Sequence, residues 1–229
     1  ETGYFERRGR LNAYALLYLV YREEKYLSLL ENVIWAICDE FTWALPAHVP
    51  AEASVYQQER WIDLFASETG FALSEIYHLI GNDLSPLVRQ RLEAEVRRRI
   101  LDSYIGRVNE YGWESCTNNW AAVCGGSVGN AFLYLGTKEE IETVLPRLRE
   151  TLRCFLAGFN DDGCCMEGYG YWCYGFGFFL QFASLLRQYT NGEIDLLADK
   201  KVEKIAQFQQ KVVLSKDNCI SFSDGGMKF

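Results

Sequence analysis

Hydrophobic residues recur at helical spacing along almost the whole chain. In the segment 25–43 the apolar side chains form one helical stripe: Leu27, Leu30, Val33, Ile34, Ile37 and Phe41. Similar periodicity predicts helices over 10–23, 25–43, 56–79, 85–104, 117–135, 137–156, 171–189 and 195–213. Ser85-Pro86 is typical of a helix start, and Asp195 can cap the last helix. Beyond these helices, only 220–223 has the pattern of a short strand or extended connector.

Short connectors between the predicted helices favour hairpins of antiparallel helices. We therefore expect an all-α domain over 1–214 and an extended tail over 215–229. Every second helix of such an array points the same way. The starts of the helices predicted at 117–135 and 171–189 would then lie on one rim. This parity would bring two unusual segments together, Asn118-Asn119-Trp120 and 169–174.

Composition and charge limit the classes of partner. The formal net charge is −8 at pH 7, which disfavours non-specific binding to nucleic acid but does not exclude an acidic ligand. Charged residues interrupt every apolar run, so we expect no membrane span, and no signal peptide is visible. The three arginines at 97–99 are expected to form a solvated face, with an anion site as the alternative. The chain begins at Glu1 without Met, and we expect both ends to lie within a longer protein.

The eight cysteines follow neither a metal-site nor a disulfide pattern. No C-x-x-C pair occurs and the chain has two histidines, so zinc-ligand spacing is absent. Cys38, Cys124 and Cys154 lie in apolar, helix-like stretches, where free cysteine behaves as a small hydrophobe. We expect mainly free thiols, no metal and no cofactor, a cysteine usage typical of a reducing compartment. His78 lies within a predicted helix and is expected to be structural.

The segment 161–175 is the richest in candidate chemistry. Its sequence is Asp-Asp-Gly-Cys-Cys-Met-Glu-Gly-Tyr-Gly-Tyr-Trp-Cys-Tyr-Gly, and a typical buried helix follows it. Aromatic faces stack on the C–H surfaces of sugars, while phenols and acids bond hydroxyl groups. A phenol can also transfer protons if its surroundings lower its pKa from about 10. The segment therefore indicates sugar binding, with a glycine-rich aromatic turn packed on its own core as the alternative.

Two motifs resemble the signatures of heparinase II/III-like polysaccharide lyases. The first runs from Trp113 to Gly126 and contains the Asn118-Asn119-Trp120 triplet. The second comprises Asp162-Gly163, Glu167-Gly168, Gly170-Tyr171-Trp172 and Tyr174-Gly175. The resemblance implies an incomplete α/α toroid that is normally followed by a β-sandwich domain, which is not in this sequence. It also implies that the partner is an acidic polysaccharide or oligosaccharide.

The resemblance further implies β-elimination at a 4-linked uronic acid, in which the C5 proton is removed and the C4 oxygen is expelled. Asn119 matches the residue that neutralises the adjacent carboxylate, with Asn118 as the alternate. Tyr174 is the first choice for the base, the acid or both, and Tyr171 is the second. Trp120 stands where related alginate lyases often carry a histidine. The family also draws a histidine, and often a structural metal, from the β-sandwich.

Four further residues are candidates for contact with substrate: Trp120, Glu167, Trp172 and His48. Structural alternatives accompany these roles. Asn119 could be only the N-cap of its helix. Glu167 could be an ordinary loop acid, and His48 an ordinary loop histidine.

Two other functional classes remain open. One is a glycoside hydrolase on the same helical scaffold, which needs two carboxylates flanking the bond. Asp161, Asp162 and Glu167 could supply them, although the adjacent Asp161 and Asp162 would ordinarily point apart. The other is a non-catalytic glycan-binding helical domain. Replacement of Tyr174 by Phe separates the classes, because a lyase would lose turnover and keep binding.

Overall fold

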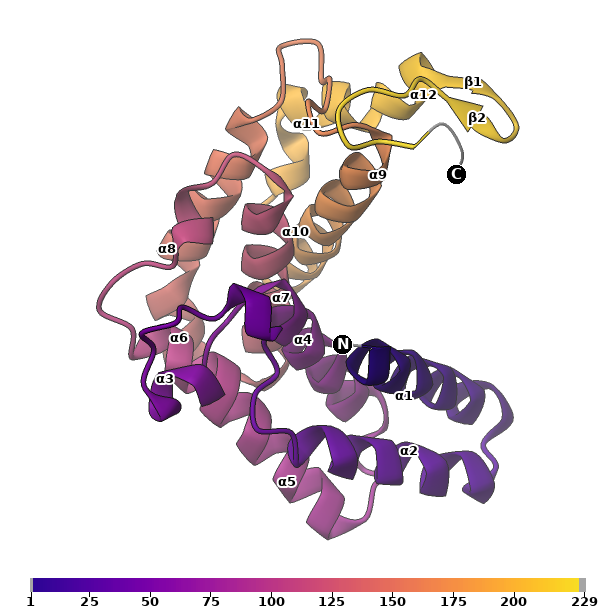
Figure 1. Ribbon diagram of the computed structural model, residues 1–229, viewed down its shortest axis with the longest axis vertical. Coiled ribbons are helices and arrows are strands. Elements are labelled where there is room, and N and C mark those ends of the chain that lie inside the picture. The colour runs from indigo at the N-terminus through magenta and orange to yellow at the C-terminus, as the bar shows by residue number, and fades with distance from the viewer. Residues whose placement is uncertain (1, 227–229) are drawn as a thin grey trace. The chain divides into compact units, whose positions relative to one another are not determined.

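The computed structural model describes residues 2–226, and within them the fold is all-α apart from two short strands (Figure 1). The all-α class predicted from periodicity is confirmed. The chain divides into two compact units. The first comprises the residues up to Arg107 together with Tyr134–Thr137. The second comprises Val108–Leu133 and the residues from Lys138 onward.

The first unit is built from helices that pack through their apolar stripes. In chain order they are α1 (Thr2–Tyr21), α2 (Glu24–Cys38), α3 (Val55–Glu59), α4 (Leu64–Ile80), α5 (Pro86–Val96) and α6 (Asp102–Ile105). A 3-10 turn lies at Pro46–His48, and a π-helical turn at Arg97–Leu101 joins α5 to α6. Helix α1 packs on α2, and α5 packs on both α2 and α4. The fully buried core includes Leu11, Leu30, Ile34, Leu73 and Leu92.

One predicted helix of this unit is two helices in the structure. The segment 56–79 divides into α3 and α4, which is a correction to the predicted boundaries. The carboxylate of Asp63 accepts a hydrogen bond from the backbone N–H of Ala66 at 2.7 Å and so starts a new helix. Periodicity does not register this break because Trp61 and Ile62 continue the apolar pattern. Helix α5 begins at Pro86 directly after Ser85, as predicted.

The arginine run at 97–99 does not form a solvated face. Arg99 is buried, with 4% of its surface exposed, so that expectation is wrong for this residue. The run lies in the π-helical turn Arg97–Leu101, where the wider helix changes the angular position of each side chain. Arg98 keeps about a third of its side chain exposed, at 31%, and forms ion pairs with Glu59 and Glu95.

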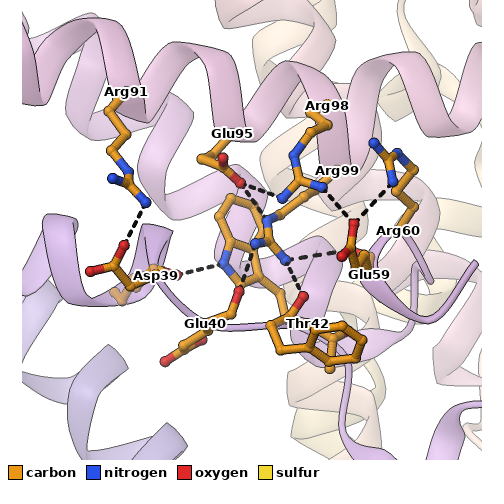
Figure 2. A network of polar contacts seen from close by, with 12 residues as sticks. Asp39, Glu40, Thr42, Glu59, Arg60, Arg91, Glu95, Arg98 and Arg99 are labelled. Carbon is orange, nitrogen blue, oxygen red and sulfur yellow. Dashed lines mark hydrogen bonds and ion pairs between the residues drawn. The ribbon is translucent and has the colours of Figure 1, made fainter. Parts of the chain in front are cut away.

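Arg99 is held by a network that joins three segments of the first unit (Figure 2). Its guanidinium donates hydrogen bonds to the carbonyl oxygens of Glu40 at 2.6 Å and Phe41 at 3.1 Å. It also donates to the carboxylate of Glu95 at 2.7 Å, and it lies 5.0 Å from the ring centroid of Trp43. The arginine therefore satisfies the backbone that follows α2, which is a structural role.

The second unit contains the candidate site. Its helices are α7 (Asn119–Leu135, whose last two residues count with the first unit), α8 (Lys138–Ala157), α9 (Tyr169–Tyr171), α10 (Gly177–Tyr189), α11 (Lys200–Ala206) and α12 (Phe208–Val212). Shorter turns lie at Gly112–Ser115 and Leu196–Ala198, and a π-helical turn at Trp172–Phe176 joins α9 to α10. Strands β1 (Val213–Ser215) and β2 (Asn218–Cys219) pair antiparallel.

Helices α7 and α8 run antiparallel, as their close contacts show. A Cβ atom at Gly125 would lie 3.0 Å from a methyl carbon of Thr151, and a Cβ atom at Gly158 would overlap the carbonyl oxygen of Thr117. Low residue numbers on α7 thus face high numbers on α8. The core between α8 and α10 is aromatic and includes Phe155, Phe159, Phe176, Phe179 and Phe182.

The end of the described chain differs from the prediction. The helix expected over 195–213 is broken into a 3-10 turn, α11 and α12. Two aspartates start separate turns, because Asp195 caps Leu197 at 2.9 Å and Asp199 caps Lys201 at 2.8 Å. The short strand lies at Asn218–Cys219 rather than at 220–223. Of the predicted tail 215–229, the last three residues, 227–229, lie outside the described residues.

Candidate functional site

The starts of α7 and of the α9–α10 segment lie at the same end of the second unit. A Cβ atom at Gly175 would lie 3.1 Å from Cα and from Cβ of Asn119. One at Gly129 would overlap the ring of Phe182. Residue numbers thus rise together along the two segments, which run parallel. This is the arrangement that helix parity predicted, and it brings the two sequence motifs together.

A carboxylate joins the two motifs directly. Oε2 of Glu167 accepts a hydrogen bond from the backbone N–H of Asn119 at 2.8 Å, and Oε1 accepts one from Nδ2 of the same residue, also at 2.8 Å. Asn119 is the first residue of α7 and is 4% exposed. A carboxylate at this position is favourable, because the first N–H groups of a helix carry a partial positive charge. Glu167 therefore holds the tyrosine-rich turn against the start of α7.

The two adjacent asparagines have different environments. Oδ1 of Asn118 accepts a hydrogen bond from the backbone N–H of Trp120 at 3.2 Å, so Asn118 supplies the cap that we had allowed for Asn119. Oδ1 of Asn119 is buried and has no hydrogen-bond partner among the described residues. A buried acceptor left unpaired costs about 1–3 kcal/mol. The side chains of Asn118 and Trp120 are both half-buried.

The tyrosines occupy an irregular helical turn. Gly168 has φ of +97°, a conformation that favours glycine, and α9 begins directly after it. The chain then widens into the π-helical turn Trp172–Phe176, a feature that occurs frequently at functional sites. Tyr171 and Tyr174 are both half-buried on this segment. The glycine after Tyr174 is the residue against which Asn119 packs, so backbone contact brings the amide and the phenol-bearing turn together.

Trp172 and Tyr169 are anchored in the core of the second unit. The ring of Trp172 stacks with those of Tyr169 at 5.5 Å and Phe176 at 5.7 Å, and its indole N–H donates to the carbonyl oxygen of Ile205 at 2.9 Å. Burial is the main cause that raises the pKa of Tyr169 to about 12, and a hydrogen bond with Cys173 is the second cause. This phenol therefore loses its proton less readily than an ordinary tyrosine does.

Sequence reasoning missed a buried ion pair before α7. Glu114 is 4% exposed, and its carboxylate accepts a hydrogen bond from Nη2 of Arg147 at 2.6 Å and a second one from Nε. It also accepts one from the backbone N–H of Tyr111 at 2.7 Å. Two-point pairing of this kind fixes geometry as well as charge. The available signal was the spacing of Tyr111 and Glu114, which form a capping box.

Sequence reasoning also missed the contribution of the tail to this site. A Cβ atom at Gly168 would lie 3.0 Å from the carbonyl oxygen of Phe222 and 3.2 Å from Cα of Gly225. The hydroxyl of Ser221 donates to the carbonyl oxygen of Gly225 at 2.8 Å, which closes a turn. Phe222 packs edge-on against Phe208 at 6.5 Å. This turn lies directly on the glycine that positions Glu167 and α9.

His48 belongs to the first unit, whereas the other candidate residues belong to the second. Its Nδ1 lies 2.7 Å from Oδ2 of Asp63, which is fully buried and also accepts a hydrogen bond from the backbone N–H of Leu45 at 3.0 Å. This contact orients the imidazole and fixes the connector before α3. His78 is exposed, and its ring packs on that of Tyr134 at 4.9 Å.

The two acids of the preceding turn differ in their contacts. Asp161 and Asp162 are exposed. The carboxylate of Asp162 accepts a hydrogen bond from the backbone N–H of Cys164 at 2.9 Å. Lys204 donates to the carbonyl oxygen of Asp161 at 2.8 Å. The turn is thereby joined to α11.

Within residues 2–226, no three or more His, Cys, Asp or Glu side chains gather as a metal ion would require. In the same range no helix combines the length and apolar character needed to cross a membrane. All eight cysteines, which lie within the described range, carry free thiols. No protein-family model matches the chain. The curated proteins likewise contain no match to it.

Proposed function

We propose that the second unit carries the catalytic site of a polysaccharide lyase that acts on uronic-acid residues of an acidic polysaccharide. In this proposal the helical hairpins belong to an incomplete α/α toroid. Asn119 and Asn118 contact the uronic acid, and a tyrosine of the α9 segment or of the π-helical turn after it moves the protons. The family resemblance of the two motifs suggests this reaction, and the geometry of their contact supports it.

The observation that carries the proposal is the contact between the two motifs through Glu167 and Asn119. The motifs are separated by 48 residues, counted from Asn119 to Glu167, yet two hydrogen bonds of 2.8 Å join them. The amide therefore lies at the turn that presents Tyr171 and Tyr174. Elimination needs a group that binds the carboxyl of the uronic acid and a proton acceptor for its C5 hydrogen within the span of one sugar ring.

In the proposed reaction a tyrosine oxygen takes the proton from C5 of the uronic acid. The C5–H electron pair forms the double bond to C4, and the C4–O bond to the leaving sugar breaks with its electrons on oxygen. A phenolic O–H returns a proton to that oxygen, so the enzyme ends with the protons it began with. Tyr174 is our first choice for this role, because it adjoins the glycine on which Asn119 packs. Tyr171 is the alternative.

The environments of Glu167 and Asp162 favour elimination over hydrolysis at these two carboxylates. A hydrolase needs one carboxylic acid and one carboxylate free to reach opposite sides of the bond. Both oxygens of Glu167 already accept hydrogen bonds from Asn119, and the carboxylate of Asp162 closes its own turn. The non-catalytic alternative, glycan binding alone, is separated from the lyase by the experiment below.

The test is to incubate the full chain with uronic-acid polysaccharides and follow the ultraviolet absorbance of the unsaturated uronide. Tyr174→Phe should lower turnover by about 10²–10⁴-fold, the usual contribution of a positioned acid or base, while the Kd for the polysaccharide stays the same. Tyr189→Phe, at the exposed far end of α10, is the matched control and should keep full activity.

Three results would contradict the proposal. Full activity of both Tyr171→Phe and Tyr174→Phe would remove the tyrosine base. Saturable binding of polysaccharide with no unsaturated product would identify a glycan-binding domain instead. Absence of both binding and product across uronic-acid polysaccharides would exclude the substrate class.

A further inference from the structure

The internal contacts of the candidate site leave the carbonyl oxygen of Asn119 without a hydrogen-bond partner among the described residues. Asn119 is 4% exposed, and Oδ1 is buried without a hydrogen-bond partner among the described residues. Buried polar atoms in folded proteins are nearly always paired, so such an atom at a candidate site points to a group that arrives from outside. It lies at the start of α7, beside the π-helical turn.

Glu167 decides which atom of the Asn119 amide is left over. A carboxylate can only accept hydrogen bonds, whereas a carboxamide has one accepting and one donating end. The end that faces Oε1 of Glu167 must therefore be the NH₂ group, and the distance of 2.8 Å is that of a good hydrogen bond. The second contact, from the backbone N–H of Asn119 to Oε2, holds the carboxylate in register with the helix. The amide is thus fixed with its oxygen turned away from Glu167.

We infer that Glu167 is a positioning residue that orients Asn119 so that the amide oxygen receives an O–H donor from the sugar. The inference rests on the proposed function and refines it. If Asn119 instead donated a hydrogen bond to an ionised carboxylate of the ligand, the unpaired atom of its amide should be Nδ2 and not Oδ1. Two sources of the donor share this chemistry: a sugar hydroxyl, and the acid form of the uronic carboxyl. In the second case the carboxyl is neutralised by keeping its proton in the complex.

The position of Asn119 leaves little freedom to reorient without a change at Glu167. Its Cα and Cβ lie against Gly175, where a Cβ atom would come within 3.1 Å of both. Its backbone N–H is held by Glu167, and its Nδ2 is held by the same carboxylate. The amide orientation is then set before the sugar arrives, which is the property expected of a preorganised contact.

Glu167→Gln tests the inference because glutamine keeps the size of the side chain and changes its polarity. Its Oε1 can still accept from the backbone N–H of Asn119, which leaves its NH₂ group facing the Asn119 amide. That amide must then turn over, with Oδ1 toward Gln and NH₂ toward the ligand. The probe is a defined uronic-acid oligosaccharide, used intact and after reduction of its carboxyl groups. Binding is measured by calorimetry on the full chain at several pH values.

The expected result is that Glu167→Gln weakens binding of the intact oligosaccharide by about tenfold or more, as for a lost hydrogen bond in a buried site. In the wild type, equal affinity for the intact and reduced oligosaccharides identifies a hydroxyl as the donor. Weaker binding of the reduced form, together with tighter binding of the intact form at lower pH, identifies the acid form. Glu167→Gln that binds the intact oligosaccharide as well as the wild type, or more tightly, overturns the inference.

A readout without ligand separates this inference from the proposed function. The side-chain amide resonances of Asn119 are assigned by their loss in Asn119→Ala. They should shift strongly in Glu167→Gln and remain unchanged in Asp162→Asn, a control that alters an exposed neighbouring carboxylate. Unchanged Asn119 resonances in Glu167→Gln overturn the positioning role. If the Asn119 resonances shift strongly in Glu167→Gln but the wild-type chain makes no unsaturated product, the positioning role of Glu167 stands and the proposed lyase activity is refuted.

Discussion

Replacing Arg99 by methionine should destabilise the first unit strongly. Methionine keeps an unbranched apolar stem but is shorter than arginine and removes every donor. The guanidinium is 4% exposed and bonds two carbonyl oxygens, those of Glu40 at 2.6 Å and Phe41 at 3.1 Å, as well as the carboxylate of Glu95 at 2.7 Å. A fourth, longer hydrogen bond goes to a third carbonyl oxygen, that of Glu59, at 3.3 Å.

The magnitude follows from what is left behind. Removal of one partner from a buried ion pair costs about 3–5 kcal/mol, largely because the remaining groups stay buried without partners. Glu95 retains Arg98 at 2.7 Å, which limits the loss at the carboxylate. The hydrogen bonds from Arg99 to the carbonyl oxygens of Glu40 and Phe41 are lost outright. We therefore expect Arg99→Met to lower the free energy of unfolding by about 3–5 kcal/mol.

The assay is urea unfolding followed by circular dichroism, with Arg98→Met as the matched control. Arg98 is the adjacent arginine, its side chain is 31% exposed, and its ion pairs should contribute about 0–1 kcal/mol. Arg99→Lys should be intermediate, because an ammonium cannot reproduce the planar fork. If Arg99→Met and Arg98→Met lose the same stability, the buried guanidinium of Arg99 does not stabilise the first unit more than the exposed one of Arg98.

Three further predictions follow from particular contacts. Burial acts to raise the pKa of Glu95, but hydrogen bonds from Arg98 and Arg99 hold that pKa below its usual 4.5, so near that pH the unfolded state binds more protons than the native state. Glu95→Gln should therefore reduce the loss of stability on acidification, and the same loss of stability as in the wild type would contradict this. Burial raises the pKa of Cys38 to about 12, so in the native protein this thiol should react with a disulfide reagent far more slowly than the exposed Cys173. After denaturation without reductant, thiol titration should find most of the eight cysteines free. A Cβ atom at Gly158 would lie 1.8 Å from the carbonyl oxygen of Thr117, so Gly158→Ala should destabilise the second unit by about 1–3 kcal/mol. The measurement is thermal unfolding, and a variant with the melting temperature of the wild type would show that the glycine is not closely packed against Thr117.

Helix periodicity carried most of the fold prediction, and it failed where a polar side chain started a new helix. Apolar residues continue through the break before α4 and through the breaks around α11, so their spacing alone cannot locate them. Asp63, Asp195 and Asp199 decide these boundaries through side-chain caps. Such caps can be suspected from sequence, but an aspartate also occurs on ordinary exposed helix faces.

The burial of Arg99 was beyond sequence reasoning because it depends on a π-helical turn. An arginine run in an amphipathic helix is normally solvated, and periodicity assumes a constant number of residues per turn. In the structure the widened turn at Arg97–Leu101 carries the buried arginine, and its partners come from segments 40 or more residues away, at Glu59 and Phe41. Long-range carbonyl acceptors leave no pattern in the local sequence.

The candidate site could be predicted in outline because helix parity is a property of the chain order. Parity predicted that the starts of α7 and of the α9–α10 segment lie at one end of the unit. In the structure these two starts are joined by hydrogen bonds between Asn119 and Glu167. The roles of Asn119, Tyr171 and Tyr174 in catalysis stay predictions. The contact of the tail with Gly168 could not be foreseen, since it depends on a turn closed by the backbone of 222–225.

The most direct test of the account is to identify the product formed when the full chain acts on a uronic-acid oligosaccharide in heavy-oxygen water. Elimination adds no water, so mass spectrometry should find an unsaturated uronide at the new end and no heavy oxygen in either fragment. Tyr174→Phe should greatly reduce the yield of that product. Heavy oxygen in the new reducing end, without unsaturation, would identify a hydrolase and contradict the central claim.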